Sequence, residues 1–430
     1  MRAQKPREIA AHILLRRGQG VDYVENLLEA ALPTLAPVDR GLCQELVCGV
    51  VRWERTLDWL ISRNTDRHPP KPALQILLRL GLYQMFWLDR VPDHAAVHET
   101  VELAKHRGFG RQAAFLNALL RACAREREAT TAMLAALKSS APGLGYSHPD
   151  WLCERWQQRW GADTMRQLLQ WNNTPPNTFA RLNTLRADAG KLLEQWRDEN
   201  VEYDFVRRDW LDENLVFELK SHPSLAALPS FRQGLFYVQD PSTLLAARAL
   251  DPRPGETILD LCAAPGGKTT FIAQLMQNRG RVVAGDPSDV RLRLLRENCA
   301  RLGVSCVETG IRLEHGANFD RVLVDAPCSN TGVMRRRVDL RWRVRSAEID
   351  RLRRVQLALL ADGSVRTKPG GTLVYSTCSL EPEENSEVVK EFLAGHPDFT
   401  LEHERELFPF ADGVDGAYVA RFSRRTAGSD

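Results

Sequence analysis

Residues 256–270 read ETILDLCAAPGGKTT, which predicts a short buried strand, a turn of small residues and the start of a helix. The strand ends near Leu261, and the turn runs from Cys262 to Lys268. Small residues in such a turn let the backbone approach a bound molecule closely. The stretch matches neither G-x-G-x-x-G nor G-x-x-x-x-G-K-[ST], which argues against NAD and ATP as ligands. A tight turn without a ligand is the alternative for the Pro-Gly-Gly triplet alone.

Three further apolar runs follow this stretch. Residues 281–286 read RVVAGD, residues 319–325 read FDRVLVD and residues 371–376 read GTLVYS. Continuous apolar runs are typical of a parallel sheet that is covered on both faces. Ligands of open α/β sheets bind beyond the carboxyl ends of the strands, where each of these runs ends in a polar or small residue. We therefore expect an α/β, Rossmann-like domain over residues 236–425.

The rest of the chain predicts two more parts, so the expected fold is multi-domain. Residues 1–140 carry apolar stripes at helical spacing between prolines, which predicts an all-α domain. Residues 139–143, SSAPG, read as a linker. Residues 145–235 alternate strand-like and helical runs, which predicts a small α+β unit of the kind found in RNA recognition motifs (RRM-like).

Composition excludes several classes of protein. The 430 residues are 43% hydrophobic and 26% charged, so the chain can bury several cores and is not disordered. There is no run of 18 apolar residues, and the N-terminus has no long apolar segment, so we expect no membrane partner, no secretory signal and a cytoplasmic location. The nine cysteines include no CxxC pair, so we expect no metal site and reduced thiols.

Two acids stand at strand tips near the turn. Asp286 ends the second apolar run, 18 residues after Lys268, and Arg291 follows on a predicted helix, where we expect it to bind the cofactor as well. An acid at this tip can accept hydrogen bonds from both hydroxyls of a ribose. Asp325 ends a later run, and the turn with these two acids fits S-adenosylmethionine as the cofactor. The alternative for Asp286 is an acid that stabilises the N-terminus of a helix.

Two cysteines follow strand ends at the same edge of the predicted sheet. Cys328 comes after Asp325-Ala-Pro, and Cys378 comes after Ser-Thr. A single cysteine at such a place is more often inert than reactive. Two of them beside a methyl donor suggest covalent catalysis, because a thiolate that adds to carbon 6 of cytosine makes carbon 5 nucleophilic. Asp325 would hydrogen-bond N3 of the ring, and the second cysteine would assist release.

Long strings of sequence resemble a known family. The strings LDLCAAPGGKTT (259–270), DRVLVDAPCSNTGVMRRRVDLRW (320–342) and LVYSTCSLEPEENSEVV (373–389) resemble the motifs of RNA 5-methylcytosine methyltransferases of the NOL1/NOP2/Sun family. Residues 1–140, with GVVRWERTLDWLI (49–61) and FLNALLRA (115–122), resemble the NusB-like helical RNA-binding domain of one subfamily, which acts on small-subunit (16S) ribosomal RNA. The likeness covers nearly the whole chain and implies a class I methyltransferase domain at its C-terminal end.

The resemblance implies a role for each candidate site residue. Cys378 would be the nucleophile, Cys328 would promote release of the methylated product, and Asp325 would lie between the cofactor and the base. Asp286 would hold the ribose. The methionine end of the cofactor would be held by the turn Cys262, Ala263, Ala264, Pro265, Gly266, Gly267 and Lys268.

The chain departs from the family pattern at a few positions. Thr309 stands where the family carries an acid on the adenine side, and Glu308 beside it is the candidate substitute. Asn330 replaces a small residue in the Ser-x-Thr-Gly turn, and Arg337-Val338 replaces a His-Pro pair. Neither cysteine is affected.

Nine arginines lie between residues 335 and 354, soon after Cys328. The guanidinium fork suits phosphate, and tryptophan can stack on a base. A base that reacts at a strand tip must be unpaired or extruded, so a loop cytidine in structured RNA is the expected target. A charged helix face in solvent is the alternative. RNA contacts are expected for Arg335, Arg336, Arg337, Arg341 and Trp342.

The expected activity is methylation of carbon 5 of one cytidine in 16S ribosomal RNA, by a monomer acting on RNA outside the fully assembled subunit. Two alternatives remain: a transfer-RNA cytosine-5 methyltransferase and a non-catalytic RNA-binding ribosome-assembly factor. The pair Cys328 and Cys378 argues against the non-catalytic factor. A DNA methyltransferase is disfavoured, because DNA enzymes of this chemistry usually place the nucleophile on the Pro-Cys turn.

Overall fold

The computed structural model describes residues 5–20, 22–65, 68–310 and 319–426. The chain groups into two compact units: Met1–Thr174 with Met334–Arg343, and Pro175–Val333 with Val344–Asp430. This grouping differs from the three expected segments at two places. The helix Asp150–Asn172 groups with the first unit, and so does the segment Met334–Arg343, although it lies inside the expected third segment. The boundaries expected from the sequence stay predictions.

The described residues of the first unit form helices and connecting turns with no strand, which confirms the all-α prediction. Proline occupies the first turn of several of these helices, where its missing N–H costs no hydrogen bond. The helices are α1 (Pro6–Gln19), α2 (Val24–Ala31), α3 (Pro37–Arg52), α4 (Glu54–Arg63), α5 (Pro72–Trp87), α6 (Asp93–His106), α7 (Ala113–Arg125), α8 (Arg127–Ser140), α9 (Pro142–Gly145), α10 (Asp150–Asn172) and α16 (Leu340–Arg343), with short 3₁₀ turns at Leu32–Thr34 and Gly110–Gln112.

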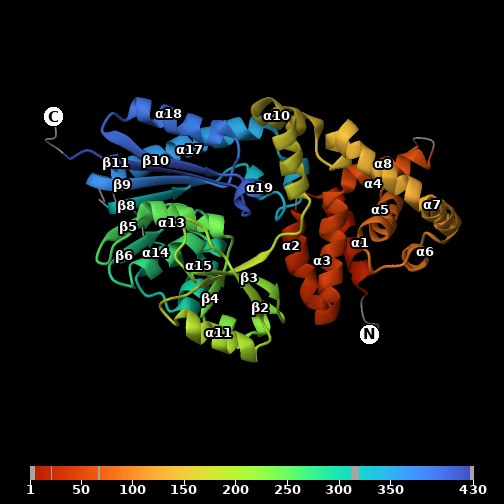
Figure 1. The fold of residues 1–430 in the computed structure, drawn as a ribbon, viewed down its shortest axis with the longest axis horizontal. Helices are drawn as coiled ribbons and strands as arrows, with labels where there is room; N and C mark the ends of the chain where they lie inside the picture. Colours follow the sequence, from red (N-terminus) through yellow and green to blue (C-terminus); the bar gives the residue numbers. More distant parts are fainter. Residues whose placement is uncertain (1–4, 21, 66–67, 311–318, 427–430) are drawn as a thin grey trace. The chain divides into compact units, whose positions relative to one another are not determined.

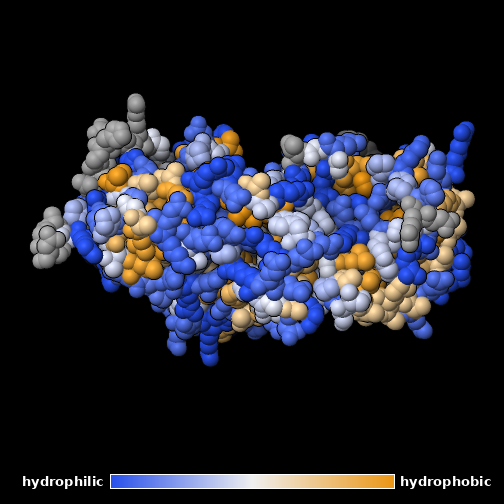
Figure 2. All heavy atoms as spheres, turned by 90° about the horizontal axis from the view of Figure 1, so that it is seen from above, coloured by the Kyte–Doolittle hydropathy of each residue, from blue (hydrophilic) through white to orange (hydrophobic). Residues whose placement is uncertain are grey.

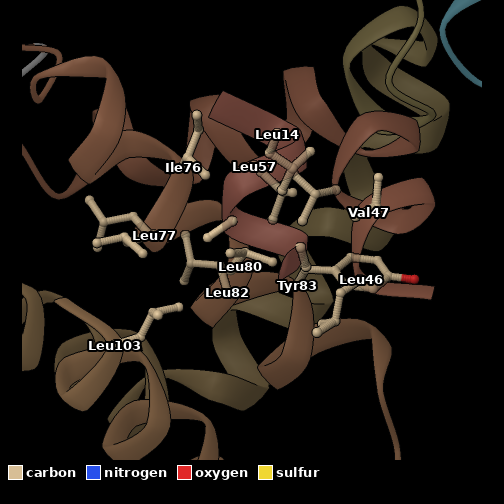
Figure 3. Close-up of a cluster of buried hydrophobic side chains, with 14 of the residues drawn as sticks. Leu14, Leu46, Val47, Leu57, Ile76, Leu77, Leu80, Leu82, Tyr83 and Leu103 are labelled. Atoms are coloured by element: carbon tan, nitrogen blue, oxygen red, sulfur yellow. The ribbon is translucent and has the colours of Figure 1, made fainter. Parts of the chain in front are cut away.

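Helix α5 forms the centre of the core of this unit. Its side chains Leu77, Leu80 and Tyr83 are buried and point toward leucines of the surrounding helices, among them Leu14 and Leu57 (Figure 3). Gly49 of α3 lies against the Tyr83 ring, and a Cβ there would overlap the ring. The close approach of α3 and α5 therefore depends on glycine at this position.

The second unit begins with a small antiparallel sheet, which confirms the predicted α+β part. Its strands lie in the order β2-β3-β1-β4. Trp196 is fully buried and packs edge-on against Phe217 and Phe236, and this aromatic cluster holds the helix on the sheet. The elements are β1 (Thr178–Leu182), α11 (Ala189–Asp198), β2 (Glu202–Phe205), β3 (Val216–Ser221), a 3₁₀ turn (Leu225–Ala227), α12 (Pro229–Arg232) and β4 (Phe236–Val238).

A seven-stranded sheet follows, in the order β10-β11-β9-β8-β5-β6-β7. Strands β5 to β9 are parallel, as expected, and β11 runs antiparallel to both β9 and β10. Helices α17 and α18 cover one face, and α13, α14 and α15 cover the other (Figure 1). This is the α/β, Rossmann-like architecture predicted from the apolar runs. The strands are β5 (Thr257–Asp260), β6 (Arg281–Ala284), β7 (Val307–Thr309), β8 (Phe319–Asp325), β9 (Thr367–Thr377), β10 (Phe399–Leu407) and β11 (Ala417–Arg424). The helices are α13 (Leu244–Leu250), α14 (Gly267–Leu275), α15 (Asp289–Leu302), α17 (Ser346–Arg366), α18 (Ser386–Gly395) and α19 (Pro409–Asp412), with 3₁₀ turns at Pro241–Thr243, Thr331–Val333 and Pro382–Glu384.

Hydrophilic side chains cover most of the face shown in Figure 2, and hydrophobic ones form separate patches between them. Among the described residues, no helix combines the length and the apolar character that a membrane span requires.

Candidate active site

Polar residues gather where the central parallel strands end. Strand β5 ends at Asp260, beside Leu323 of β8, and β8 ends at Asp325, beside Ser376 of β9. Strand β6 ends at Ala284 and leads through Gly285 to Asp286. The parallel pairing therefore brings the ends of these neighbouring strands, with their acids, to one edge of the sheet.

The turn from Cys262 to Lys268 is fixed by backbone contacts. The Ala263 N–H donates to the Gly285 carbonyl at 2.8 Å, which ties the turn to the end of β6. Gly266 has a φ of +104°, a conformation that L side chains rarely adopt, and it opens helix α14. The sequence identified this turn as a candidate site, and the glycine is required by its backbone geometry.

Asp260 is an acid that the sequence analysis did not assign to the site. It is fully buried, its Oδ2 accepts a hydrogen bond from the Thr269 hydroxyl at 2.8 Å, and its Oδ1 has no partner. Burial raises its pKa to about 7, the charge of Asp325 adds to this rise, and the bond from Thr269 opposes it. A buried carboxylate oxygen without a partner is open to a ligand donor such as an ammonium group.

Asp286 presents a second buried carboxylate at the next strand. Its Oδ1 accepts from the Ser288 N–H at 3.0 Å, whereas its buried Oδ2 makes no hydrogen bond and lies 3.2 Å from Arg291 Nη1. Arg291 also donates to the Ala264 carbonyl of the turn. The open oxygen of Asp260 and the carboxylate of Asp286 fit a ligand with N–H and O–H donors, as S-adenosylmethionine has in its amino group and ribose.

Asp325 is held from two sides. Lys268 Nζ lies 2.7 Å from Oδ2, and the Ser376 hydroxyl donates to Oδ1 at 2.7 Å. Burial alone would lower the pKa of Lys268, but the charge and hydrogen bond of Asp325 outweigh it, so that pKa is raised. Lys268 is therefore a permanent cation beside Asp325, whose side chain keeps 28% of its surface exposed.

The two candidate cysteines are in contact. Their Sγ atoms are 3.3 Å apart, the Cys378 N–H donates to Cys328 Sγ at 3.4 Å, and the Cys378 thiol donates to Asn330 Oδ1 at 3.1 Å. Cys328 is buried and Cys378 is partly exposed. The hydrogen bond with Cys378, burial and the nearby charge of Glu384 raise the pKa of Cys328 well above its ordinary value. Cys328 thus stays a thiol, and Cys378 is the more accessible sulfur.

Glu384 forms hydrogen bonds with both of the turns that carry Cys328 and Cys378. It was not identified from the sequence. It is fully buried and accepts the Ser329 N–H at 2.8 Å, the Ser379 hydroxyl at 2.5 Å and Gln356 Nε2 at 3.0 Å. Each serine directly follows one of the cysteines. The sequence features that could have pointed to Glu384 are the repeated Cys-Ser pair and the acids of LEPEEN (380–385). Burial raises the pKa of Glu384, and the serine hydrogen bonds oppose the rise.

The adenine-side candidates lie at β7. Glu308 forms an exposed ion pair with Arg281 at 2.7 Å, and Thr309 Oγ1 accepts from Arg296 at 3.1 Å. Arg281 lowers the pKa of Glu308 through their hydrogen bond. The idea that Glu308 replaces the family's acid stays a prediction.

The structure corrects the RNA-contact prediction for Arg335 and Arg341, which are buried, whereas Trp342 is partly exposed. Arg341 is fully buried in the first unit and donates to the carbonyls of Arg52 and Asn172 at 3.1 and 2.8 Å. Trp342 Nε1 donates to the Val51 carbonyl at 2.8 Å, and Arg335 is 2% exposed and stacks on Trp171. The buried guanidinium groups of Arg335 and Arg341 cannot reach RNA, and contact of the partly exposed Trp342 with RNA stays a prediction.

The other two residues of the prediction reach the surface. Arg337 is exposed, with its guanidinium 5.7 Å from the Tyr23 ring, and Arg336 is partly exposed. Contact of these two residues with RNA stays a prediction.

Three family models match successive parts of the chain. The model described as 16S rRNA methyltransferase RsmB/F matches residues 247–423. The NusB family model matches residues 4–125, and a ferredoxin-like domain model of RsmF/B-like methyltransferases matches residues 148–217.

Relatives match along almost the full length of the chain. Probable ribosomal RNA small subunit methyltransferase B of Bacillus subtilis is 37% identical over 412 residues, which are 93% of this chain and 90% of the relative. Ribosomal RNA small subunit methyltransferase B of Klebsiella pneumoniae is 35% identical over 434 residues, 97% of this chain and 98% of the relative. The crystal structure of PH0851 shares the fold, with a TM-score of 0.78 at 24% identity over 98% of this chain and 99% of that one.

Proposed function

Because this chain belongs to the RsmB/F family of 16S rRNA methyltransferases, we propose that it methylates carbon 5 of a cytidine in 16S ribosomal RNA and uses S-adenosylmethionine as the methyl donor. The observation that carries the cytosine-5 chemistry is the pair Cys328 and Cys378, with sulfur atoms 3.3 Å apart at the ends of adjacent strands. Methylation of a nitrogen or of a ribose hydroxyl needs no thiol, whereas carbon 5 of cytosine needs a nucleophile on carbon 6.

Cys378 is the nucleophile in this proposal. Its sulfur bonds to carbon 6 of the ring, the electrons of the 5,6 double bond move toward N3, and the thiol proton ends on N3. Asp325 relays that proton, with the Lys268 ammonium 2.7 Å behind it to stabilise the negative charge that develops. The ring is then an enamine, and its carbon 5 can accept a methyl group.

S-adenosylmethionine supplies, when bound, an electrophilic methyl group on a positively charged sulfur. The turn from Cys262 to Lys268 would hold its methionine end, with the open oxygen of Asp260 toward the amino group. Asp286 would accept the ribose hydroxyls, and Arg291 would keep Asp286 in place through the 3.2 Å ion pair.

Cys328 acts at the end of the reaction. Water takes the proton from carbon 5, the electrons of that C–H bond re-form the 5,6 double bond, and the bond between carbon 6 and sulfur breaks with its electrons on sulfur. The proton on N3 passes to solvent, which restores the aromatic ring, and the leaving Cys378 thiolate takes a proton from Cys328, which is reprotonated from solvent. Cys328 is in contact with the leaving sulfur and has a thiol proton to give, because its pKa is raised. We assign it to this release step.

Methyl transfer to unmodified RNA tests the proposal. We expect labelled methyl groups from S-adenosylmethionine to enter 16S ribosomal RNA, at one cytidine that bisulfite sequencing locates. Cys378→Ser should lower turnover by roughly a thousandfold or more, because a hydroxyl is a far weaker nucleophile than a thiolate. Cys328→Ala should accumulate an RNA–protein complex that survives denaturant, because release is slowed.

Cys48→Ala is the matched control, since Cys48 is a cysteine of α3 in the helical unit, and it should turn over like the wild type. Wild-type turnover by Cys378→Ser would show that another group is the nucleophile. Methylation of transfer RNA in place of ribosomal RNA would change the substrate, and a well-folded protein without any transfer would indicate an assembly factor.

A further inference from the structure

The turn between Cys328 and Gly332 contains a side chain that contacts both cysteines. Asn330 has a φ of +59°, in the left-handed region that asparagine, aspartate and glycine tolerate best. This backbone conformation directs its side chain back over the turn. Asn330 Nδ2 donates to the Cys328 carbonyl at 2.6 Å, and Asn330 Oδ1 accepts from the Cys378 thiol at 3.1 Å.

The orientation of the Asn330 amide follows from its partners. With the amide reversed, its oxygen would face the Cys328 carbonyl oxygen, and two acceptors would repel each other. The amide oxygen is therefore the atom that faces Cys378. Because the single proton of the Cys378 thiol points to this oxygen, the contact between the sulfurs takes its proton from Cys328.

We propose that Asn330 is a positioning residue that keeps resting Cys378 as a directed, neutral thiol, through the hydrogen bond from its S–H to Asn330 Oδ1, until the RNA base enters. This inference rests on the proposed role of Cys378 as the nucleophile. A hydrogen bond to the neutral form of a group disfavours its charged form, so the amide oxygen opposes formation of the thiolate. A neutral thiol is also slow to react with oxidants and alkylating agents, which protects a sulfur that is partly exposed.

Other titratable groups of both charge signs lie around the two sulfurs. Lys268 on α14 is positive, whereas Asp325 on β8 and Glu384 in the Pro382–Glu384 turn are negative. The Cys328 sulfur also lies 3.3 Å from the Cys378 sulfur and accepts from the Cys378 N–H at 3.4 Å. None of them changes in the variants below, so a shift between variants reports on residue 330 alone.

Two substitutions at this position separate the proposal from a purely structural role. Asn330→Gly removes the acceptor, and glycine tolerates the left-handed backbone without strain. Asn330→Asp keeps the size and the backbone preference of asparagine but directs a carboxylate at the sulfur. The first change should ease formation of the thiolate, and the second should hinder it.

The measurement is the pH dependence of Cys378 alkylation by iodoacetamide in the folded full-length protein, followed by mass spectrometry of the peptide that contains Cys378. We expect the midpoint to move down by roughly half to one pH unit in Asn330→Gly, the shift that one hydrogen bond produces, and to move up by at least as much in Asn330→Asp. Cys262 in the same samples is the internal control, and its profile should not move. The acidic limb of the methyl-transfer rate should shift in the same directions.

The proposal would be overturned if the alkylation midpoints of both variants equal that of the wild type, or if both move in the same direction. A loss of packing alone would shift the midpoint in the same direction in both variants. If Asn330→Gly unfolds, the alkylation midpoint of Asn330→Asp still tests the proposal. Alkylation requires neither RNA nor cofactor, so a negative result here leaves the methyl-transfer proposal intact. Failure of that proposal appears separately, as undiminished turnover by Cys378→Ser.

Discussion

Protonation of the Asp260 carboxyl group affects the stability of the catalytic unit. Its pKa of about 7 in the fold stands against 3.8 for an ordinary aspartate, because burial penalises the charged form. The folded protein therefore binds a proton that the unfolded chain releases between these values. The stabilising contribution is complete below about pH 4 and is lost as the pH rises through about 7.

Asp260→Asn should remove this dependence, because the amide cannot ionise. Relative to the variant, the wild type should lose free energy of unfolding between pH 4 and pH 7.5, by no more than about 4 kcal/mol. Urea titrations at a series of pH values measure the difference. Asp289→Asn, at an exposed acid of α15, is the control and should show no such slope. A flat difference for Asp260→Asn as well would mean that the carboxyl is ionised in the fold.

At the scale of elements, the ends of β8 and β9 are joined through one carboxylate. Glu384 accepts hydrogen bonds from Ser329, Ser379 and Gln356, so the turns that carry Cys328 and Cys378 share an anchor. Gly332 brings the same turns together, because a Cβ there would lie 2.7 Å from the Cys378 carbonyl oxygen. The distance between the sulfurs is therefore set by the packing of two turns.

Glu384→Ala should lower the free energy of unfolding by about 3 kcal/mol, because buried donors lose their acceptor. Glu384→Gln keeps the volume and one acceptor, so its cost should be about half as large, while methyl transfer still falls because the turns shift. Denaturant unfolding and turnover measure the two effects. Glu391→Ala, in an exposed pair with Arg353, should cost less than about 1 kcal/mol. Equal effects of Glu391→Ala and Glu384→Ala would contradict an anchoring role.

At the scale of the whole molecule, the helical unit is assembled from two separate pieces of chain. Asp339, within the segment Met334–Arg343, has no exposed surface and accepts from the Val24 N–H at 2.7 Å and from Arg17 at 2.5 Å. Arg17 also forms an ion pair with Glu54, which in turn pairs with Arg79. Ion pairs thus connect this segment to helices α1, α4 and α5, and the Val24 hydrogen bond connects it to α2.

Asp339→Ala should destabilise the helical unit by about 3 kcal/mol, since it leaves the Val24 N–H without its acceptor and Arg17 with one partner fewer. Hydrogen exchange of the amides in α1 and α2 should become faster, which localises the effect. Asp350→Ala removes an exposed carboxylate nearby in the sequence and should change the stability by less than about 0.5 kcal/mol. Unchanged exchange in α1 would show that Asp339 does not support this unit.

The same segment shows where the sequence was informative and where it was not. The order of apolar runs and turns predicts the α/β sheet and places Asp325, Cys328 and Cys378 near strand ends, because those features are local in the chain. The burial of the Arg341 side chain does not follow from the local sequence, because its hydrogen-bond acceptors are backbone carbonyls more than a hundred residues away in the chain. A run of arginines looks the same whether its donors face phosphate or buried carbonyls. The role of Asn330 likewise depends on a backbone angle that the letters do not reveal.

The interrupted path of the chain also limits how enzymes of this kind can be recombined. The polypeptide leaves the catalytic unit after Val333 and returns to it at Val344. A hybrid gene joined only near residue 174 would take Asp339 from one parent and Arg17 from the other. Shuffling at one junction should therefore give mismatched, unstable hybrids, whereas transplanting both pieces together would carry the helical module intact to a new catalytic partner.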